Sequence, residues 1–284
     1  MTQRVALVTG AGRGLGRVMA LALLAEGHKV ILSSTNQQTL DDVASESGAG
    51  TDRVATIICD LTTDDGAERL AADASSIFGP IDIFLSNAGI GIDALRRNYM
   101  ENPFNFWEID REKLNLFFSV NATSPIMIAA RLAPSMIEKG WGRIVSNTTS
   151  LDTMLRMPLY GGSKAAMEAE VSVMAHNLAG TGVTANVLIP GGATVSRMTE
   201  RIGIKVEDMF PDTIMEGPIR FLASDLSDDF TGRRILANRW PAGMDLVEAS
   251  VVASDPIAWT GFGAAGVHPS STRGIFRRDS GVGE

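Results

Sequence analysis

Apolar runs alternate with amphipathic segments over the first 240 residues of the chain. The apolar runs are short, as in buried strands, and lie at residues 4–9, 29–34, 54–58, 81–85, 142–145, 182–189 and 233–237. Segments with apolar residues at helical spacing separate them, at residues 18–25, 64–78, 112–138, 161–179 and 206–223. Strands that alternate with helices predict an α/β fold, a doubly wound parallel sheet whose ligands bind beyond the carboxyl ends of the strands.

This pattern ends at Trp240. Residues 241–284 are rich in Gly, Ala, Ser and Pro and lack sustained periodicity. We therefore expect a single domain over residues 1–240 and an irregular C-terminal tail over residues 241–284, packed on the domain or on a neighbouring subunit. With 284 residues and 45% hydrophobic side chains, the chain is long enough to bury one large core.

The charge balance argues against a nucleic-acid partner. The chain has 25 Lys and Arg against 33 Asp and Glu, a net charge of −8, and no basic run that would follow a phosphate backbone. The single cysteine, Cys59, follows an apolar run and has no disulfide partner, as is usual in the reducing cytosol. No signal peptide is evident and no apolar stretch approaches about 18 residues, so we expect a cytoplasmic protein without a membrane partner.

A glycine-rich turn joins the first predicted strand to the first predicted helix. It holds Gly10, Gly12, Arg13, Gly14, Leu15 and Gly16. Glycines let backbone N–H groups approach a pyrophosphate, and the start of a helix favours the negative charge. The turn follows the pattern T-G-x-x-x-G-x-G, because Leu15 occupies the third glycine position of the common fingerprint G-x-G-x-x-G. It predicts a dinucleotide site, and the alternative is a turn without a ligand.

The end of the second predicted strand bears on the choice between NAD and NADP. A carboxylate there would bind a ribose 2′-hydroxyl and repel a 2′-phosphate. The strand instead ends in the hydroxyl groups of Ser34 and Thr35, and Arg13 can reach a nearby phosphate. We therefore expect NADP in preference to NAD, which stays possible.

Tyr160 and Lys164 are the residues around which we expect the chemistry. They lie four apart at the start of a predicted helix, so their side chains share a face. A neighbouring ammonium lowers the pKa of a phenol and makes it a usable acid or base near neutral pH. Hydroxyl groups follow the preceding strand, at Ser146, Thr148, Thr149 and Ser150. The alternative is that Tyr160 is a core residue and Lys164 a solvated lysine.

Other candidate residues stand at strand ends or inside a helix. The tripeptide Asn87-Ala88-Gly89 follows the fourth strand, and Pro190-Gly191 ends the sixth. Asn121 lies in the middle of a helix, where an amide needs a hydrogen-bonding reason. The long irregular segment 90–110 carries four aromatic residues, so we expect a pocket wall, with surface packing or subunit contact as the alternative.

Taken together, these motifs resemble the classical short-chain dehydrogenase/reductase family over about residues 4–238. The resemblance implies a Rossmann-type sheet of about seven parallel strands, with cofactor and catalytic groups in residues 1–240. It also implies hydride transfer between a nicotinamide cofactor and a small-molecule carbonyl or alcohol, and a homo-oligomer, either a dimer or a tetramer.

The resemblance also implies roles for individual residues. Tyr160 would be the general acid, Lys164 would lower its pKa and hold the nicotinamide ribose, and Asn121 would support a water relay. Asp60 with Leu61 would bind adenine, and Asn87, Ala88 and Gly89 would line the cofactor cleft.

The sequence departs from the family pattern at three places. The segment before Tyr160 is shorter than usual, so the catalytic hydroxyl belongs to Ser150, which we prefer on residue type, or to Thr149. The threonine expected after Pro190-Gly191 is matched by Thr194 or Ser196, either of which could hold the carboxamide. Asn238-Arg239-Trp240 replaces the usual glycine pair near the last strand.

The sequence also allows two other functions for the chain and a binding role for two arginines. The chain could be a catalytically silent NAD(P)-binding sensor or regulatory protein, which the intact Tyr160 and Lys164 pair disfavours. It could be a serine hydrolase using Ser163, although no histidine is placed as its base and no metal spacing occurs. Arg96 and Arg156 could bind a substrate carboxylate, although we regard them as surface residues.

Overall fold

The computed structural model describes residues 2–99, 101–196, 199 and 204–258 of the chain. Within these residues a sheet of eight strands runs in the order β3-β2-β1-β4-β5-β6-β7-β8. The strands are β1 (Val5–Thr9), β2 (Lys29–Ser34), β3 (Val54–Ile58), β4 (Ile83–Ser86), β5 (Gly142–Asn147), β6 (Val183–Ile189), β7 (Arg233–Leu236) and β8 (Ser254–Pro256). The first seven strands are parallel and β8 pairs antiparallel with β7. The predicted doubly wound parallel sheet is therefore confirmed, with one further edge strand.

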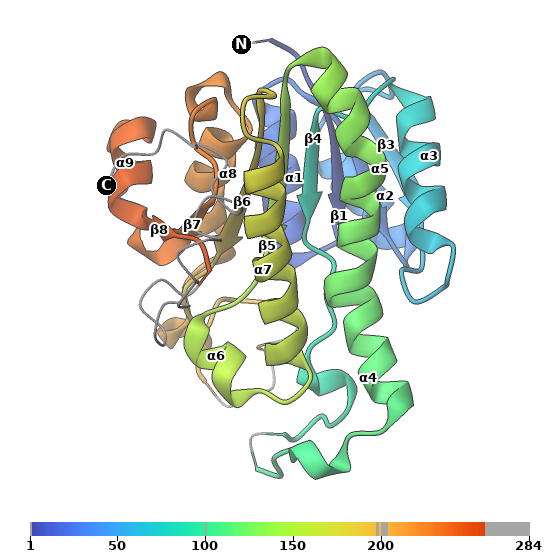
Figure 1. Cartoon of the computed structure of the whole chain (residues 1–284), viewed down its shortest axis with the longest axis vertical. Coiled ribbons are helices and arrows are strands. Elements are labelled where there is room, and N and C mark those ends of the chain that lie inside the picture. Colours follow the sequence, from blue (N-terminus) through green and yellow to red (C-terminus); the bar gives the residue numbers. More distant parts are fainter. Residues whose placement is uncertain (1, 100, 197–198, 200–203, 259–284) are drawn as a thin grey trace, which may run out of the picture.

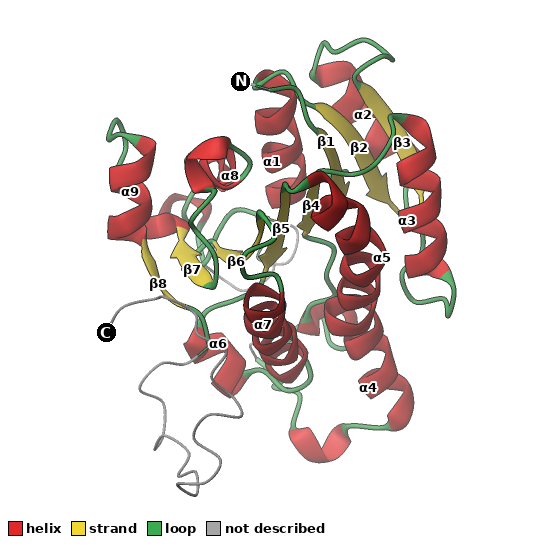
Figure 2. Ribbon diagram, turned by 45° about the horizontal axis from the view of Figure 1, so that its top comes forward, coloured by secondary structure: helices red, strands yellow, loops and turns green. Residues whose placement is uncertain are grey.

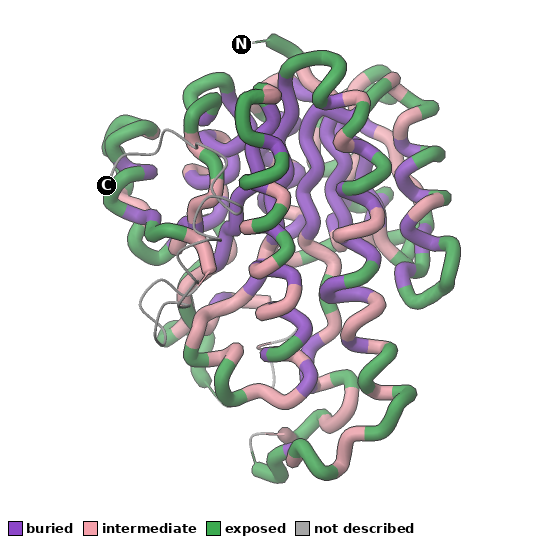
Figure 3. The backbone as a smooth tube through the Cα atoms, viewed as in Figure 1, coloured by how far each residue is buried: buried purple, intermediate pink, exposed green. Residues whose placement is uncertain are grey.

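Helices cover both faces of the sheet (Figures 1 and 2). They are α1 (Gly14–Ala25), α2 (Gln37–Glu46), α3 (Gly66–Ile77), α4 (Arg111–Phe118), α5 (Ser124–Lys139), α6 (Leu151–Arg156), α7 (Tyr160–Asn177), α8 (Glu216–Leu222) and α9 (Leu246–Ala253). Alternate strand residues point to opposite faces. Leu7 and Phe84 belong to the apolar cluster shared with α3, α5 and α7, whereas Ala6 and Val8 belong to the cluster shared with α1 and α8. Figure 3 shows the resulting buried central layer.

The carboxyl ends of the strands face a separate group of elements. In Figure 1 the segment before α4, the start of α4, and α6 extend below the sheet. A third apolar cluster holds this region together, formed by Ile92, Phe104, Phe117 and Leu159. The fold therefore places a small apolar wall beside the edge where a doubly wound sheet binds its ligands.

One continuous helical stretch, Arg111–Lys139, comprises α4, a π-helical turn at Ser119–Thr123, and α5. By length and composition it could cross a membrane, unlike the sequence-based expectation, yet half of its apolar window is buried inside the molecule. Its buried residues Ile128, Ala129 and Leu132 pack in the core with α3 and α7, which is the behaviour of a core helix. Pro125 lies just after the π-helical turn, so the proline, which has no N–H, lies where the α-helical hydrogen-bond ladder is already interrupted.

The structure departs from the predicted elements in two places and adds two helices where no element was predicted. Helix α2 was not predicted, because only its Leu40 and Val43 are buried and the rest of it is polar. Residues 206–223 form two short 3₁₀ turns followed by α8, because Pro211 interrupts the helix between them. Residues 151–156 are helical as α6. Part of the predicted tail forms α9 and β8, and residues 259–284 lie outside the described residues.

Candidate active site

The glycine turn between β1 and α1 is lined by backbone. Gly10 and Gly14 have φ values of +65° and +52°, which favour glycine. A Cβ on Gly16 would lie 2.2 Å from the carbonyl oxygen of Gly10, and one on Gly12 would lie 2.3 Å from Oγ1 of Thr39. Helix α1 begins at Gly14 without a side-chain cap. Its first N–H groups are therefore available to an anion, so the turn fits the pyrophosphate of a nicotinamide dinucleotide.

A chain of amides connects this turn to the ends of β4 and β5. The Nδ2 of Asn87 donates to the carbonyl oxygens of Thr9 and Gly10 at 3.2 and 3.1 Å. Asn147, the last residue of β5, donates from its own Nδ2 to Oδ1 of Asn87 at 2.8 Å. The hydroxyl oxygen of Thr9 accepts the N–H groups of Asn87 and Ala88, each at 3.1 Å. The predicted Asn87 thus fixes the shape of the turn, and Asn147 is a site residue that the sequence analysis missed.

The end of β2 meets the start of α2 beside the glycine turn. Asn36 caps α2 by accepting the N–H of Thr39 at 3.1 Å. The Oγ of Ser34 lies 3.3 Å from the position of a Cβ on Gly12, while Thr35 and Arg13 are exposed. No carboxylate occurs between residues 33 and 36. The region therefore offers hydroxyl groups and the amino end of a helix, both suited to a phosphate oxygen.

The residues after β3 have local partners. Asp60 is exposed, and its Oδ1 accepts the N–H and the hydroxyl of Thr62 at 2.9 and 2.7 Å. These two bonds hold the pKa of the Asp60 carboxyl below its usual range. Leu61 is buried, and its carbonyl oxygen accepts the hydroxyl of Ser124 at 2.9 Å. Asp60 thus stands as an accessible, ionised acceptor near the strand ends.

Tyr160 is placed by an unusual turn. Leu159 has φ +63° and ψ −56°, and the N–H of Tyr160 donates to the carbonyl of Pro158 at 2.7 Å. This is a γ-turn with a positive φ, a strained conformation that persists only when its surroundings hold it. The side chain of Leu159 supplies that support, because it is buried in the third apolar cluster. Helix α7 therefore begins at Tyr160, with the ring packed against the same cluster.

The pKa of the phenol differs from the sequence-based expectation. Burial raises the pKa of Tyr160 to about 12, and a hydrogen bond with the Thr149 side chain opposes this rise. The predicted lowering by Lys164 was wrong, since burial outweighs any effect of that lysine, whose Nζ lies 5.9 Å from the centre of the ring. Lys164 is itself only 5% exposed, and burial lowers its pKa to about 8. Its Nζ donates to the carbonyl of Asn147 at 2.9 Å.

The four candidate hydroxyl groups have different environments. Among them, the Thr149 side chain is the one that opposes the rise in the pKa of the Tyr160 phenol. Ser150 instead caps α6, accepting the N–H of Thr153 at 3.2 Å. Thr148 donates to Glu168, and Ser146 is buried on β5 with no hydrogen-bond partner within the described residues. The geometry therefore favours Thr149 over Ser150, contrary to our preference from residue type.

Asn121 lies in the π-helical turn and is buried. Its Oδ1 accepts the N–H of Ile90 at 2.8 Å, and its Nδ2 donates to the carbonyl of Ile90 and to the hydroxyl of Ser163. A Cβ on Gly89 would lie 3.2 Å from Oδ1 of Asn121 and 3.3 Å from Nζ of Lys164. The amide, Gly89 and the lysine therefore meet at one point. Ser163 is fully buried in this network, which argues against a role as hydrolytic nucleophile.

The residues after β6 close over the opposite side of the glycine turn. Pro190 is followed by Gly191, whose φ of +91° turns the chain. The hydroxyl of Thr194 donates to the carbonyl of Gly192 at 3.0 Å. The Cβ of Ser196 lies 3.8 Å from the position of a Cβ on Gly14. Ser196 thus faces the proposed pyrophosphate turn, while Thr194 is buried behind it.

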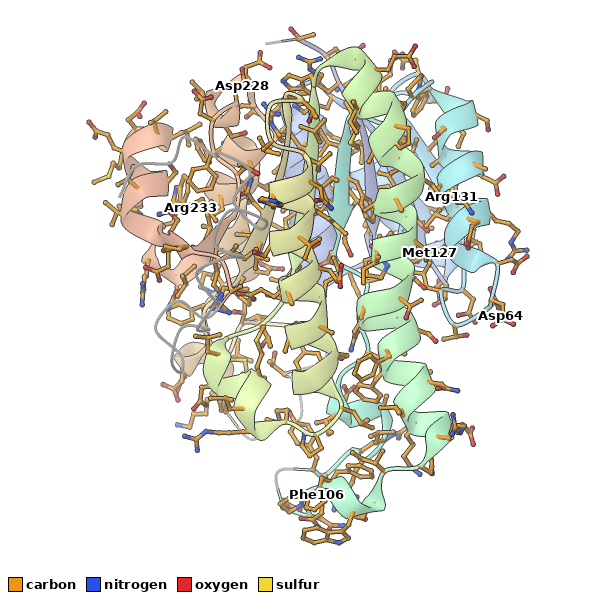
Figure 4. The ribbon with its side chains drawn as sticks, in the orientation of Figure 1. Asp64, Phe106, Met127, Arg131, Asp228 and Arg233 are labelled. Atoms are coloured by element: carbon orange, nitrogen blue, oxygen red, sulfur yellow. The ribbon has the colours of Figure 1, made fainter. Side chains whose placement is uncertain are left out.

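The segment 90–110 is held by Arg96, which pairs with Glu108 at 2.5 Å and donates to the carbonyl of Pro103 at 2.9 Å. Arg156 forms an exposed pair with Asp152. Both arginines thus have structural partners. Phe106 and Trp107 are 71% and 70% exposed, and Figure 4 shows Phe106 at the lower end of the molecule. No cluster of three possible metal ligands occurs in the described part of the chain, and His268 lies outside it.

Comparison with known proteins finds a family model and similar proteins that match most of the chain. The family model for short chain dehydrogenase matches residues 4–206. A short-chain type dehydrogenase/reductase of Picea abies is 33% identical over 78% of this chain and 86% of its own length. A 3-oxoacyl-[acyl-carrier-protein] reductase of a Synechocystis strain is 31% identical, over 79% of this chain and 91% of its own. A gluconate 5-dehydrogenase of Gluconobacter oxydans is 30% identical, over 88% of this chain and 86% of its own length.

Solved structures share the fold. A blue fluorescent protein from a metagenomic library, crystallised with NADPH, superposes with a TM-score of 0.71 at 23% identity, covering 82% of this chain and 95% of its own. A putative gluconate dehydrogenase from Agrobacterium tumefaciens gives a TM-score of 0.70 at 24% identity, and the match covers 82% of this chain and 93% of that protein.

Proposed function

Since the chain belongs to the short-chain dehydrogenase/reductase family and is thus an NAD(P)-dependent oxidoreductase, we propose that it reduces a small carbonyl compound with NADPH. The observation that carries the proposal is the arrangement of Tyr160, Lys164 and Asn121. Lys164 follows Tyr160 by one turn of α7, and a Cβ on Gly89 would lie 3.3 Å from its Nζ and 3.2 Å from Oδ1 of Asn121. The Tyr160 phenol is protonated at neutral pH, since burial raises its pKa, so it can act as the general acid of a reduction.

Each residue of the site then has a stated part. Tyr160 donates its proton to the carbonyl oxygen of the substrate, and the hydroxyl of Thr149 hydrogen-bonds to the same oxygen. Lys164 binds ribose hydroxyls through its further N–H donors, and Asn121 holds the backbone at Ile90 beside it. The nicotinamide cofactor supplies the hydride when bound.

The glycine turn, Asp60 with Leu61, the tripeptide 87–89, and Ser196 or Thr194 would hold that cofactor. NADPH is favoured over NADH because residues 33–36 contain no carboxylate and adjoin the amino end of α2. The NADPH complex of the similar metagenomic protein supports the same preference.

The substrate is expected to carry an apolar group next to its carbonyl. Near Tyr160, the partly buried side chains of Ile90, Leu95 and Met157 are apolar, and they pack on the buried cluster of Ile92, Phe104 and Leu159. Such a surface suits the alkyl chain of a ketone or 3-oxoacyl compound, the latter being the substrate class named for the Synechocystis relative. A homo-oligomer, either a dimer or a tetramer, and a cytoplasmic location complete the proposal.

A spectrophotometric screen tests the function. NADPH oxidation is followed with ketones, sugars and 3-oxoacyl thioesters, with Tyr160→Phe as the blank and NADPH affinity measured by fluorescence. We expect turnover of an apolar carbonyl by the wild type, and a Tyr160→Phe protein that binds NADPH normally but is at least about 10²-fold slower. Tight NADPH binding without turnover of any compound would instead indicate the silent sensor protein.

A further inference from the structure

A buried ion pair lies one helical turn beyond the proposed catalytic lysine. Glu168 follows Lys164 by four residues on α7, so both side chains stand on the same helix face. Its partner is Arg234 on β7, with Nε 3.1 Å from Oε1 of Glu168. The two side chains are 0% and 7% exposed. The pair is therefore much more buried than the surface ion pairs, and the cost of burying two charges has to be explained.

The pair is attached to the loop that carries Thr149. Oε2 of Glu168 accepts the hydroxyl of Thr148 at 3.0 Å, and Nη2 of Arg234 donates to the backbone carbonyl of Thr149. Two successive residues of the loop are therefore each held by one member of the pair. The Thr149 side chain, in turn, lies close enough to Tyr160 to lower the pKa of its phenol.

The energetics suggest that stability alone does not account for the pair. Burial raises the pKa of Glu168 and lowers that of Arg234, so each charge is costly and is offset mainly by the other. Arg234 Nε and Glu168 Oε1 face each other without hydrogen-bond alignment within the described residues. Apolar side chains of similar size commonly stabilise a fold as well as such a pair does. What they cannot replace is the fixed donor and acceptor that hold the loop.

We propose that Glu168 and Arg234 are positioning residues that fix the backbone at Thr148 and Thr149 and thereby aim the Thr149 hydroxyl at Tyr160. The proposal rests on the proposed function for its catalytic consequence. Its structural part, the placement of Thr149 against the phenol, can be measured without any substrate. A displacement of about 1 Å in such a group can reduce turnover about 10²-fold.

The test compares single and paired variants. Glu168→Met and Arg234→Met each leave one buried charge unpaired, so both single variants are expected to unfold more easily. The double variant Glu168→Met/Arg234→Met removes both charges together with the acceptor and donor that hold the loop, and is expected to recover thermal stability. Arg143→Met/Asp228→Asn is the control, since it removes the fully buried arginine near the start of β5 and its exposed carboxylate partner Asp228, neither of which contacts Thr149.

Turnover separates a positioning role from a structural one. We expect the double variant to show a kcat reduced about 10²-fold, with NADPH affinity and thermal stability near those of the wild type. The control double variant should keep its kcat. A double variant that regains both stability and full kcat would show that the pair serves the fold alone and would overturn the proposal.

A spectroscopic readout keeps this inference independent of the proposed function. The chain has two tyrosines, so Tyr99→Phe leaves Tyr160 as the only one, and ring-labelled tyrosine gives a single NMR signal. Thr149→Val defines the shift caused by losing the hydrogen bond. The pair variant should reproduce that shift and the control variant should not, even where no carbonyl compound is reduced. An unshifted Tyr160 signal in the pair variant would contradict the proposal.

Discussion

Burial of Lys164 makes a quantitative prediction about stability. Its pKa falls from an ordinary value of 10.5 to about 8 because the ammonium is taken out of water. This drop corresponds to about 3 kcal/mol of unfolding free energy lost at pH values below 8. Replacing the lysine by methionine, which fills similar space without charge, removes that penalty. The lost hydrogen bond to the carbonyl of Asn147 costs about 1 kcal/mol, so Lys164→Met should be about 2 kcal/mol more stable near pH 7.

The sign of the pH dependence follows from proton binding. Between pH 8 and 10.5 the unfolded chain holds a proton on this lysine that the folded chain has released, so wild-type stability rises with pH. From about pH 7 to 9.5, about 2 kcal/mol of the penalty should disappear. Tyr160 has the opposite effect, a stability that falls as the pH rises, but only above pH 10, because its pKa is raised from 10 to about 12.

Urea unfolding at a series of pH values measures the effect. The stability difference between Lys164→Met and the wild type should shrink by about 2 kcal/mol over this range. Lys205→Met is the matched control, because that side chain is exposed in a surface pair with Glu207, and its difference from the wild type should stay constant. A constant difference for Lys164→Met as well would refute the reasoning. The same variant should also lose NADPH turnover, which would make Lys164 a residue kept for function at the expense of stability.

Three further predictions concern the cofactor and the hydroxyl group. Gly16→Ala places a Cβ 2.2 Å from the carbonyl oxygen of Gly10, so thermal unfolding should show a loss of about 1–3 kcal/mol and NADPH titration weaker binding. Gly162→Ala, whose Cβ would make an ordinary contact with Phe118 at 3.9 Å, should show neither change. Ser34→Asp should weaken NADPH binding about tenfold by repulsion of the 2′-phosphate while leaving NADH affinity unchanged, and equal losses for both would exclude that contact. Thr149→Val should lower kcat by about 10²–10³-fold. Ser150→Ala removes the N-cap of α6, so it should cost about 1 kcal/mol of stability and leave kcat unchanged. A large loss of kcat in Ser150→Ala, with none in Thr149→Val, would instead make Ser150 the catalytic hydroxyl.

The strands were the predictable part of the fold. Buried parallel strands are short apolar runs bounded by turn residues, and all seven of them are visible in the sequence for that reason. Helix α2 was not predicted, because a helix that mostly faces solvent has little apolar periodicity. Asn36, a residue type that commonly caps helices, did indicate where it begins. Strand β8 was also not predicted. It is an edge strand of three residues, Ser254–Pro256, and such a strand needs no apolar pattern.

For the site, residue types were more predictable than electrostatics. The spacing of Tyr160 and Lys164 correctly indicated a shared helix face, but spacing says nothing about the burial that dominates both pKa values. The choice between Thr149 and Ser150 depended on α6, whose first turn uses Ser150 as its cap. Glu168 and Arg234 are far apart in the chain, and no local pattern relates them.

The central claim is that Tyr160 enters the reaction as a protonated phenol. Ultraviolet titration of the Tyr99→Phe protein measures this directly, since Tyr160 is then the single tyrosine and tryptophan does not ionise in this range. The structure predicts no phenolate absorbance up to about pH 10 while the protein stays folded. A phenolate signal that rises with a midpoint near neutral pH would contradict the account.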